Sequence, residues 1–354
     1  MCGFICIYNS AGKLKSSEKR LRAAGRLLKH RGPDDEGFYM DDHFGVHFNR
    51  LSIMDPSDLG HQPMISDDGR FILVFNGEIY NAFELRKKLK DKNYSFESTS
   101  SDTEVLLKLF IEYGTEACHQ LRGMFAFVVW DKRAQILYAY RDRIGIKPLY
   151  FAFRDGQVIF GSEAKAILGY YPELRKINSE SVYKYISRGW VDTDQNTFFK
   201  DIKHLLPGHY ATVRKGEFVL SKYWSLKIND PTSDSLDEFK QEFETTIEQH
   251  LQTDVSYAST LSGGIDSSAI VTVAAGLLPS PDHLTAFSVL PEETIDESFW
   301  INGTVKHTGI KHHYVKIGEV DISRTVEKIL NAHDEPFQHS NCIFLHSWRN
   351  WREL

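Results

Sequence analysis

The pattern of apolar residues changes part-way along the chain, and this change limits the fold more than any other feature. Before about residue 226, short β-rich runs such as MFAFVVWD (124–131) alternate with helical patterns. After a polar stretch at 227–235, the order becomes strand, glycine turn, helix and strand. The first pattern is typical of layered α+β packing, and the second of a βαβ unit in a parallel sheet. We therefore expect two domains, with the boundary at about 226–236.

Local signals predict individual elements within this frame. Besides the run at 124–131 and GFICIYN near the start, strands are predicted at 70–81, 136–142, 148–153, 254–261 and 283–290. Helices are predicted at 81–92, 103–114, 236–251 and 269–278. Ser101 and Asp102 supply N-cap chemistry for the second of these helices, and a glycine ends it.

Composition narrows the class of protein. The chain has 354 residues, which at about 150 residues per domain also favours two domains. Its formal charge of −6 gives no reason to expect a nucleic-acid or membrane partner. The sequence contains no apolar run near the ~18 residues of a membrane helix, and MCGFICIYNS is not a secretory signal. Four cysteines make no disulfide framework, so we expect a reducing, cytoplasmic location.

Cys2 is the first candidate for chemistry. A small second residue permits removal of Met1, which would leave Cys2 with a free α-amine. That amine has an ordinary pKa of about 7.7–8.0 and a thiol about 8.5, so the amine can take the thiol proton near neutral pH. By itself Cys2 reads as a small core residue. A metal site with Cys6 is not expected, because no third cysteine or histidine lies nearby.

Polar motifs follow Cys2 in an order that suits cleavage of a carboxamide. In FNGEIYN, the Asn76 amide and the Gly77 backbone N–H would supply an oxyanion hole. An amino-acid substrate also needs an arginine for its carboxylate and acids for its ammonium group. Arg50 lies in FNRLSIMD (48–55), which we expect to be extended, and Asp102 lies at a helix start. Taken singly, these residues would be interpreted as a turn pair, a surface or core-edge arginine and an N-cap.

In this order after Cys2, the motifs closely resemble the N-terminal-nucleophile glutaminase domain of class II glutamine amidotransferases. The resemblance runs to about Trp224 and includes HRGPDDEG (30–37), DRIGIKPLYF (142–151), GSEAKAIL (161–168) and LPGHY (206–210). HRGPDDEG, RLSIMD and FNGEIYN are most similar to the asparagine synthetase branch. The resemblance implies an α+β fold, an αββα sandwich, over residues 2–225.

The resemblance also implies a role for each residue. Cys2 would be the nucleophile, forming a γ-glutamyl thioester and releasing ammonia, with its α-amine as the general base. Asn76 and Gly77 would form the oxyanion hole. The residues that would hold glutamine are Arg50, for the carboxylate, and Glu78 and Asp102, for the ammonium group. Arg31 and Asp34 are interpreted as supporting loop residues, and Cys6, Cys118 and His119 as structural.

The segment SGGIDSS (262–268) is the main candidate site of the second part. Its backbone N–H groups and the following helix dipole would form an anion cradle, although it lacks the Gly-Lys-Ser/Thr of a Walker A loop. A bare SGG would read as a capped turn. Here it resembles the pyrophosphate loop of ATP pyrophosphatases. The ATP-binding residues so implied are Leu261, Ser262, Gly263, Gly264, Asp266, Ser267, Ser268 and Val289, with Asp266 also positioning Mg²⁺.

The same resemblance identifies 236–354 as a partial asparagine synthetase domain, an α/β parallel-sheet domain of ATP-pyrophosphatase type. FSV (287–289), Asp296-Glu297 and HDEPF (333–337) match the family, and the pair His312-His313 is interpreted as structural. The family's further SG-x-G-x-DE-x-x-GGY loop and its pyrophosphate-steadying lysine do not occur, and FLHSWRNWREL loses the resemblance. We therefore expect an incomplete domain with weak or absent pyrophosphate release.

Three hypotheses follow. The first is a glutamine-hydrolysing asparagine synthetase, a carbon–nitrogen ligase that uses glutamine, aspartate and ATP with Mg²⁺; ammonia would displace AMP from β-aspartyl-AMP. The second is a glutaminase or amidotransferase with another acceptor, such as a sugar acid. The third is a non-catalytic fragment that binds or regulates. Cys2 favours the first two. A homodimer is a further expectation, and no nucleic-acid or membrane partner is expected.

Overall fold

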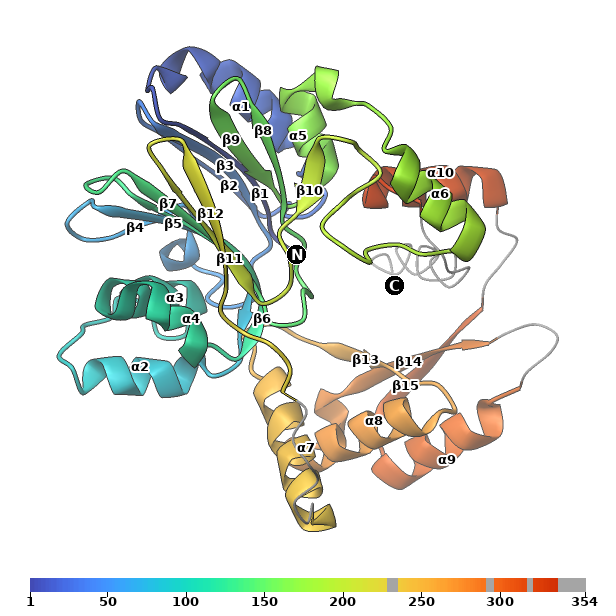
Figure 1. Cartoon of the computed structure of the whole chain (residues 1–354). Helices are drawn as coiled ribbons and strands as arrows, with labels where there is room; N and C mark the ends of the chain where they lie inside the picture. The colour runs from blue at the N-terminus through green and yellow to red at the C-terminus, as the bar shows by residue number, and fades with distance from the viewer. Residues whose placement is uncertain (228–234, 291–295, 317–320, 337–354) are drawn as a thin grey trace. The chain divides into compact units, whose positions relative to one another are not determined.

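The chain divides into two compact units, which are described separately below (Figure 1). The computed structural model describes residues 1–227, 235–290, 296–316 and 321–336. The first unit comprises Met1–Lys227 and also takes in Asp334 and Glu335, and the second contains the other described residues up to His333. Most of the polar stretch predicted as a linker, and the FLHSWRNWREL stretch, lie outside the described residues.

Two antiparallel sheets form the middle layers of the first unit. The first sheet, in spatial order, consists of β10 (Ile202–His204), β8 (Tyr150–Arg154), β9 (Gln157–Gly161), β1 (Gly3–Asn9), β3 (Phe44–Arg50) and β2 (Asp35–Met40). The second consists of β12 (Glu217–Lys222), β11 (His209–Arg214), β7 (Ile136–Arg141), β6 (Gly123–Asp131), β5 (Phe71–Ile79) and β4 (Met64–Ile65). Along β1, alternate side chains face opposite ways, so Phe4 and Cys6 pack between the sheets.

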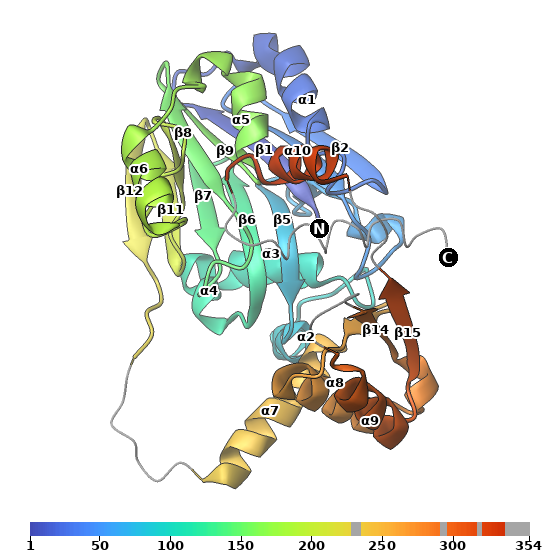
Figure 2. The ribbon, with the colours of Figure 1, turned by 90° about the vertical axis from the view of Figure 1, so that its right-hand side faces the viewer.

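Helices cover the outer faces of both sheets (Figures 1 and 2). The remaining alternate residues of β1, Ile5 and Ile7, pack against α1 (Glu18–Arg26) and α5 (Ala164–Tyr170). The outer face of the second sheet is covered by α2 (Ala82–Lys90), α3 (Asp102–Tyr113) and α4 (Ala117–Gln120). The last helix of this unit is α6 (Ser179–Arg188). The predicted αββα sandwich is confirmed, and Cys6 and Cys118 are buried in its core.

The second unit contains a parallel three-stranded sheet, as its βαβ pattern predicts. Its strands are β13 (Ala258–Thr260), β14 (Thr285–Leu290) and β15 (Lys311–Lys316). Its helices are α7 (Leu236–His250), α8 (Ile265–Leu277), α9 (Ser298–Thr308) and α10 (Ile322–His333). The side chains of Ile247, Val271 and Ile301 from three of these helices meet in one buried cluster.

Two predicted boundaries in this unit are wrong. The strand expected over 254–261 is only three residues long, since Val255 N–H donates to Thr253 Oγ1 at 3.3 Å and the chain turns before it reaches β14. The helix expected over 269–278 begins at Ile265. The first turn of this helix is polar and has no hydrophobic periodicity, so a prediction based on apolar residues placed the start of the helix too late. The segment after the glycines is therefore already helical.

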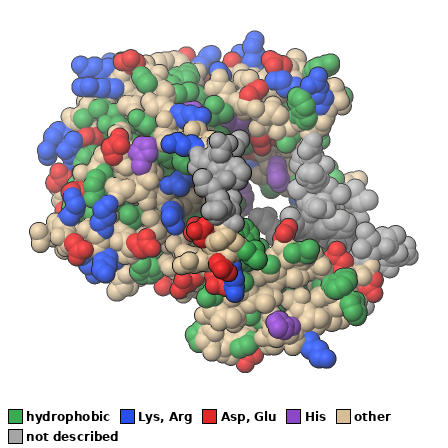
Figure 3. Space-filling view, turned by 60° about the horizontal axis from the view of Figure 1, so that its bottom comes forward, with side chains coloured by type: hydrophobic (Ala, Val, Ile, Leu, Met, Phe, Trp, Pro, Cys, Tyr) green, Lys and Arg blue, Asp and Glu red, His purple; other side chains and the backbone are tan. Residues whose placement is uncertain are grey.

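The described residues were expected to include neither a membrane-spanning helix nor a basic surface for nucleic acid. No helix among the described residues is both long and apolar enough to cross a bilayer. On the face in Figure 3, side chains of both charge signs are interspersed. A basic field of the kind that steers nucleic acid is not seen on that face.

Candidate active site

Cys2 lies directly before β1, at the end of the first sheet. Because β1 pairs antiparallel with β3, Gly3 lies opposite Asn49, and the chain after Arg50 passes close to Cys2. The Cys2 thiol donates to Leu51 O at 3.6 Å, and Leu51 N–H points to Cys2 Sγ at 3.4 Å. Burial raises the pKa of the Cys2 thiol. The thiol is therefore neutral near pH 7 and needs a base before it can attack.

The chain terminus supplies an amine of suitable basicity. Burial lowers the pKa of the terminal amine to about 6, and the positive charges of Arg31 and Lys147 act in the same direction. In the structure this amine belongs to Met1, which is half-exposed and stands in for the amine that Cys2 would carry once Met1 is removed. Burial at this end of the chain therefore favours the unprotonated form of the Met1 amine.

Asn76 and Gly77 lie near the end of β5, in the second sheet. Asn76 is 1% exposed, yet its amide nitrogen and oxygen have no hydrogen-bond partner among the described residues. A buried polar group left unpaired costs about 1–3 kcal/mol. A Cβ on Gly77 would lie 2.2 Å from Met124 O, so only glycine permits the approach of β6. The site therefore holds a buried amide whose hydrogen-bonding capacity is unused.

Arg50 ends β3 and is almost completely buried. Its guanidinium donates to Ser57 O at 2.8 Å, to Met54 O at 3.4 Å and to Asp55 O. The chain folds back to make these contacts, so the extended segment predicted at 48–55 stops at Arg50. A Cβ on Gly60 would lie 1.8 Å from Arg50 Nη2, so the glycine makes room for the guanidinium. Carbonyl groups orient the cation without cancelling its charge.

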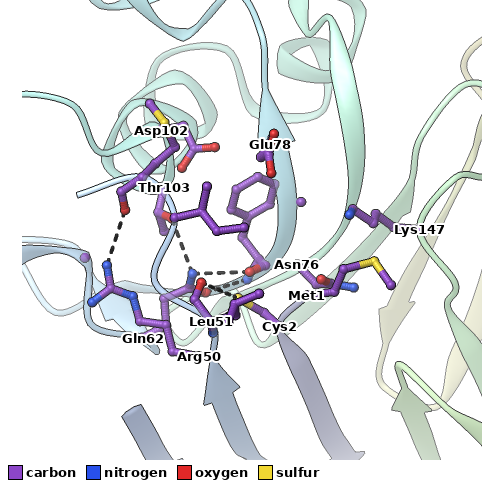
Figure 4. A pocket seen from close by; sticks show the side chains of 15 residues that line it. Met1, Cys2, Arg50, Leu51, Gln62, Asn76, Glu78, Asp102, Thr103 and Lys147 are labelled. Atoms are coloured by element: carbon purple, nitrogen blue, oxygen red, sulfur yellow. Dashed lines mark hydrogen bonds between the residues drawn. The ribbon is translucent and has the colours of Figure 1, made fainter. Parts of the chain in front are cut away.

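Two acids lie across the pocket from Arg50 (Figure 4). Asp102 begins α3 and is buried, and its Oδ2 accepts a hydrogen bond from Ile79 N–H at 3.1 Å. Burial raises the pKa of Asp102 to about 7, and the negative charge of Glu78 contributes to the rise. The interpretation of Asp102 as an N-cap is wrong, because Ser101 caps the helix by accepting from Glu104 N–H at 3.3 Å. Two neighbouring acids make a site for a cation.

All six residues predicted for glutamine chemistry line one pocket, between the ends of the two sheets (Figure 4): Cys2, Arg50, Asn76, Gly77, Glu78 and Asp102. Gln62, Thr103 and Lys147 also line it, although the sequence analysis did not single them out. Gln62 fixes β5, because its Oε1 accepts from Phe75 N–H at 2.6 Å. Lys147 belongs to the DRIGIKPLYF motif, and that was the one available signal for it.

Arg31 and Asp34 both hold backbone next to the nucleophile. Arg31 Nε–H donates to Cys2 O at 2.9 Å. Asp34 Oδ2 accepts from Ser52 N–H at 2.8 Å, one residue after the Leu51 that contacts the thiol. The two loop residues therefore fix the backbone on either side of the Cys2 thiol contact.

Comparisons with known proteins agree with this geometry. Residues 1–224 match the family model described as "Glutamine amidotransferase domain", and residues 238–348 match "Asparagine synthase". Asparagine synthetase [glutamine-hydrolyzing] 1 of Bacillus subtilis (strain 168) is 35% identical over 98% of this chain and 55% of its own length. A putative asparagine synthetase [glutamine-hydrolyzing] 2 of Methanocaldococcus jannaschii is 32% identical over 95% of this chain and 69% of its own. The chain belongs to the glutamine-hydrolysing asparagine synthetase family.

The family includes relatives with other names. "Amidase chyE" of Penicillium rubens is 33% identical over 92% of this chain and 52% of its own length. The chain spans about half the length of the first curated relatives that it matches. Membership of the asparagine synthetase family therefore identifies both parts of the chain without identifying the acceptor.

In the part that matches asparagine synthase, the glycine-rich loop connects β13 to α8. Ser262 N–H donates to Ser267 Oγ at 3.1 Å, and the hydroxyls of these two serines lie 2.8 Å apart. Gly263 N–H donates to Glu297 Oε2 at 2.9 Å, and Gly264 N–H donates to Ser262 Oγ at 3.2 Å. The first three N–H groups of the loop predicted to bind phosphate therefore already have acceptors, one of which is a carboxylate.

The neighbouring strand β14 holds the start of this loop through hydrogen bonds to Leu261. Leu261 N–H donates to Phe287 O at 2.9 Å, and Val289 lies two residues further along β14. Ser288 Oγ donates to Leu261 O at 2.6 Å and also lies 2.8 Å from His312 Nε2. His312 therefore supports the strand, in line with its structural interpretation.

Two groups of residues are candidates for binding a metal ion. Asp266 is exposed in the first turn of α8, and Ser268, two residues on, continues the helix. Among the described residues, Asp192, His204 and Glu335 of the first unit bring three ligand atoms within 4.8 Å of one another. Both carboxylate oxygens of Glu335 already accept hydrogen bonds, one of them from a backbone N–H at 2.6 Å. This trio reads as an ion-pair cluster rather than a metal centre.

Proposed function

We propose that the first unit hydrolyses glutamine to glutamate and ammonia, with Cys2 as the nucleophile. The observation that carries this proposal is the buried Asn76 amide, which has no partner among the described residues and lines the same pocket as Cys2. An unsatisfied buried donor is expensive unless a substrate uses it. A carboxamide whose carbonyl oxygen gains negative charge is the substrate that this donor suits best.

The reaction would begin at the chain terminus. The unprotonated α-amine takes the proton of the neutral Cys2 thiol as sulfur attacks the side-chain carbonyl carbon of glutamine. The tetrahedral oxyanion accepts hydrogen bonds from the Asn76 amide and Gly77 N–H. The amine then returns its proton to the leaving nitrogen, and ammonia departs. Water attacks the resulting thioester in the same way and releases glutamate.

Charge complementarity would orient the substrate. The Arg50 guanidinium, held by carbonyl groups that leave its charge uncompensated, would pair with the glutamine α-carboxylate. Glu78 and Asp102 would receive the α-ammonium group, whose charge would lower the raised pKa of Asp102. Glutamine would thus supply the two charges that this pocket lacks.

The second unit would use the ammonia. On this proposal residues 2–225 form the glutaminase and 236–354 belong to the synthetase domain, where ATP converts aspartate to β-aspartyl-AMP and ammonia displaces AMP. The ATP site would consist of Leu261, Ser262, Gly263, Gly264, Asp266, Ser267, Ser268 and Val289. Asp266 would hold Mg²⁺, which neutralises phosphate charge when bound. A cytoplasmic location and a homodimer stay predictions.

A second candidate differs only in the acceptor. A relative named "Amidase chyE" is 33% identical to this chain and carries a different name from the synthetases. A glutaminase with another acceptor, such as a sugar acid, is therefore kept as an alternative. Feeding [amide-¹⁵N]glutamine with ATP and either aspartate or a sugar acid, and following the label by NMR, distinguishes the two.

The glutaminase proposal is tested by changing the nucleophile. Cys2→Ala should lower glutamate release to background, by roughly 10,000-fold or more, because no other group replaces the thiol. Cys118→Ala is the matched control, since Cys118 is buried, its thiol contacts Thr115 O at 3.0 Å, and it is not among the residues that line the pocket. Mass spectrometry must first show that Met1 is absent. Unchanged glutamate release in folded Cys2→Ala protein would overturn the proposal.

A further inference from the structure

A row of buried charges leads from the backbone of Cys2 to the residue that follows α10. Arg31 donates through Nε–H to Cys2 O at 2.9 Å and through Nη1–H to Glu163 Oε1 at 2.8 Å. Glu163 also pairs with Lys165 through its other oxygen. Lys165 Nζ lies 3.2 Å from Asp334 Oδ1, and its backbone N–H donates to Asp334 Oδ2 at 2.7 Å. Charge alternates at each step.

These charges are shielded from water. The side chains of Arg31, Glu163 and Asp334 are 8%, 9% and 6% exposed, respectively, and Lys165 is 20% exposed. Burial alone would raise the pKa of Glu163, but the hydrogen bond from His30 and the charges of Arg31 and Lys165 lower it to about 2. Interactions between buried charges are screened little by solvent or salt. Each charge in the row therefore acts strongly on its neighbours.

The backbone at Gly3 and at Asp334, the two ends of this row of charges, permits the contacts. A Cβ on Gly3 would lie 2.9 Å from Arg31 Cδ, so glycine after Cys2 lets the arginine side chain lie against the backbone of the nucleophile. Asp334 has φ = +65°, a left-handed conformation that aspartate tolerates better than most residues. The chain thus accepts an uncommon conformation where it places this carboxylate on Lys165.

We propose that Asp334 is a positioning residue for the glutaminase nucleophile, acting through Lys165, Glu163 and Arg31. The inference rests on the glutaminase activity proposed above. Lys165 is shared between two carboxylates. Without the charge of Asp334, Lys165 loses one of its two carboxylate partners and no longer fixes Glu163 in place for Arg31. The Cys2 carbonyl then loses a fixed donor, and the thiol and amine no longer keep one attack geometry.

The neighbouring acid offers a matched control. Glu335 docks the same segment, because its Oε1 accepts from Phe198 N–H at 2.6 Å and its Oε2 from Tyr150 O–H at 3.3 Å, whereas Asp334 contacts Lys165. Asp334→Asn keeps the shape and removes the charge. In the full chain at pH 8, we expect Asp334→Asn to lower kcat roughly 10-fold with KM for glutamine unchanged, since small misplacements of a nucleophile are costly. Glu335→Gln should change neither.

A double-mutant cycle tests the route. Lys165→Met should lower kcat as much as Asp334→Asn, and the two together should be no worse than either alone, because both break the same row. Additive losses, or equal losses for Asp334→Asn and Glu335→Gln, would overturn the inference. The rate of Cys2 alkylation by iodoacetamide, localised by mass spectrometry of the N-terminal peptide, gives the same comparison without glutamine. An inactive wild type whose alkylation still responds to Asp334→Asn would reject the glutaminase and retain the positioning role.

Discussion

The two candidate sites solve the same problem, holding polar groups ready for a charged substrate, in opposite ways. In the glutaminase pocket the groups are buried and keep unused capacity: the Asn76 amide has no partner among the described residues, and Asp102 carries a raised pKa. In the glycine-rich loop the groups are mostly exposed and already occupied. Ser262 and Ser267 bond each other, and Glu297 accepts from Gly263 N–H.

This difference separates a preorganised site from one that must rearrange. Groups fixed by a folded core cost stability when empty but need no reorganisation when the substrate arrives. Groups that satisfy one another are stable when empty, and a ligand must displace those contacts first. Substitutions in the pocket should therefore reduce activity with little loss of stability, whereas substitutions in the loop should change affinity modestly and in either direction.

Asn76→Ala should give the largest separation of activity from stability. We expect kcat for glutamine hydrolysis to fall about 100- to 1,000-fold, which is the usual cost of removing one oxyanion donor. KM should change little, because the interaction forms mainly in the transition state. The melting temperature should not fall, since no hydrogen bond between described residues is lost. Steady-state kinetics and thermal melting measure the two effects.

Asn81→Ala is the matched control for this substitution. Asn81 is also a buried amide just beyond β5, but its Nδ2–H donates to Gln120 O at 2.9 Å and its Oδ1 accepts from Arg122 N–H at 2.9 Å. Its loss should lower the melting temperature and leave kcat almost unchanged. If both variants lose stability and activity together, the view of Asn76 as a reserved donor fails.

Asp102→Asn should also weaken glutamine binding while it increases stability, because it removes a buried charge. Removing one of the two acids should raise KM for glutamine roughly 10-fold, the value of one charge-assisted hydrogen bond. The ordinary pKa of aspartate is 3.8, and burial raises that of Asp102 to about 7, so above pH 7 the folded chain bears a buried charge that the unfolded chain exposes. Asparagine should therefore raise the free energy of unfolding at pH 8 by about 1 kcal/mol or more, and the gain should disappear below about pH 4.

Asp131→Asn should change stability at pH 8 in the opposite direction. Asp131 is buried too, but its pairing with Arg70, at 2.7 and 3.0 Å, outweighs burial and lowers its pKa. Its replacement should lower stability at pH 8 and leave KM unchanged. Urea unfolding at pH 4 and pH 8 measures both variants. A loss of stability in Asp102→Asn at pH 8 would contradict the view that the buried charge of Asp102 destabilises the fold when no glutamine is bound.

The sequence predicted six residues that the fold brings into one pocket, because each lies in a short local motif. Cys2 is next to the terminus, and Asn76, Gly77 and Glu78 are consecutive, so a strand end brings them together. The carbonyl cradle of Arg50 was missed, since an alternating pattern says nothing about a chain that folds back on a side chain. The contact between Lys165 and Asp334 spans 169 positions of sequence, and a linear pattern carries no signal for it.

In the second unit the sequence predicted the parallel sheet but not the state of its loop. The strand–turn–helix order is periodic and local, and it places the two glycines between β13 and α8 as expected. The carboxylate of Glu297 on Gly263 N–H comes from 34 positions further along the chain. A Gly-rich turn taken alone therefore looks like an open cradle, although the N–H groups of Ser262, Gly263 and Gly264 have acceptors in the fold.

Glu297→Gln gives the smallest expected effect and tests the occupied side of the comparison. Glu297 places a negative charge where a phosphate oxygen would accept from Gly263 N–H, so the ligand must displace it against like-charge repulsion. Glutamine keeps an acceptor and removes the charge, so pyrophosphate should bind about three- to fivefold more tightly in calorimetry. Glu242→Gln, an exposed acid on α7, controls for the change in net charge. Weaker binding in Glu297→Gln would mean that the carboxylate shapes the cradle for phosphate, and the loop would then be as preorganised as the glutaminase pocket.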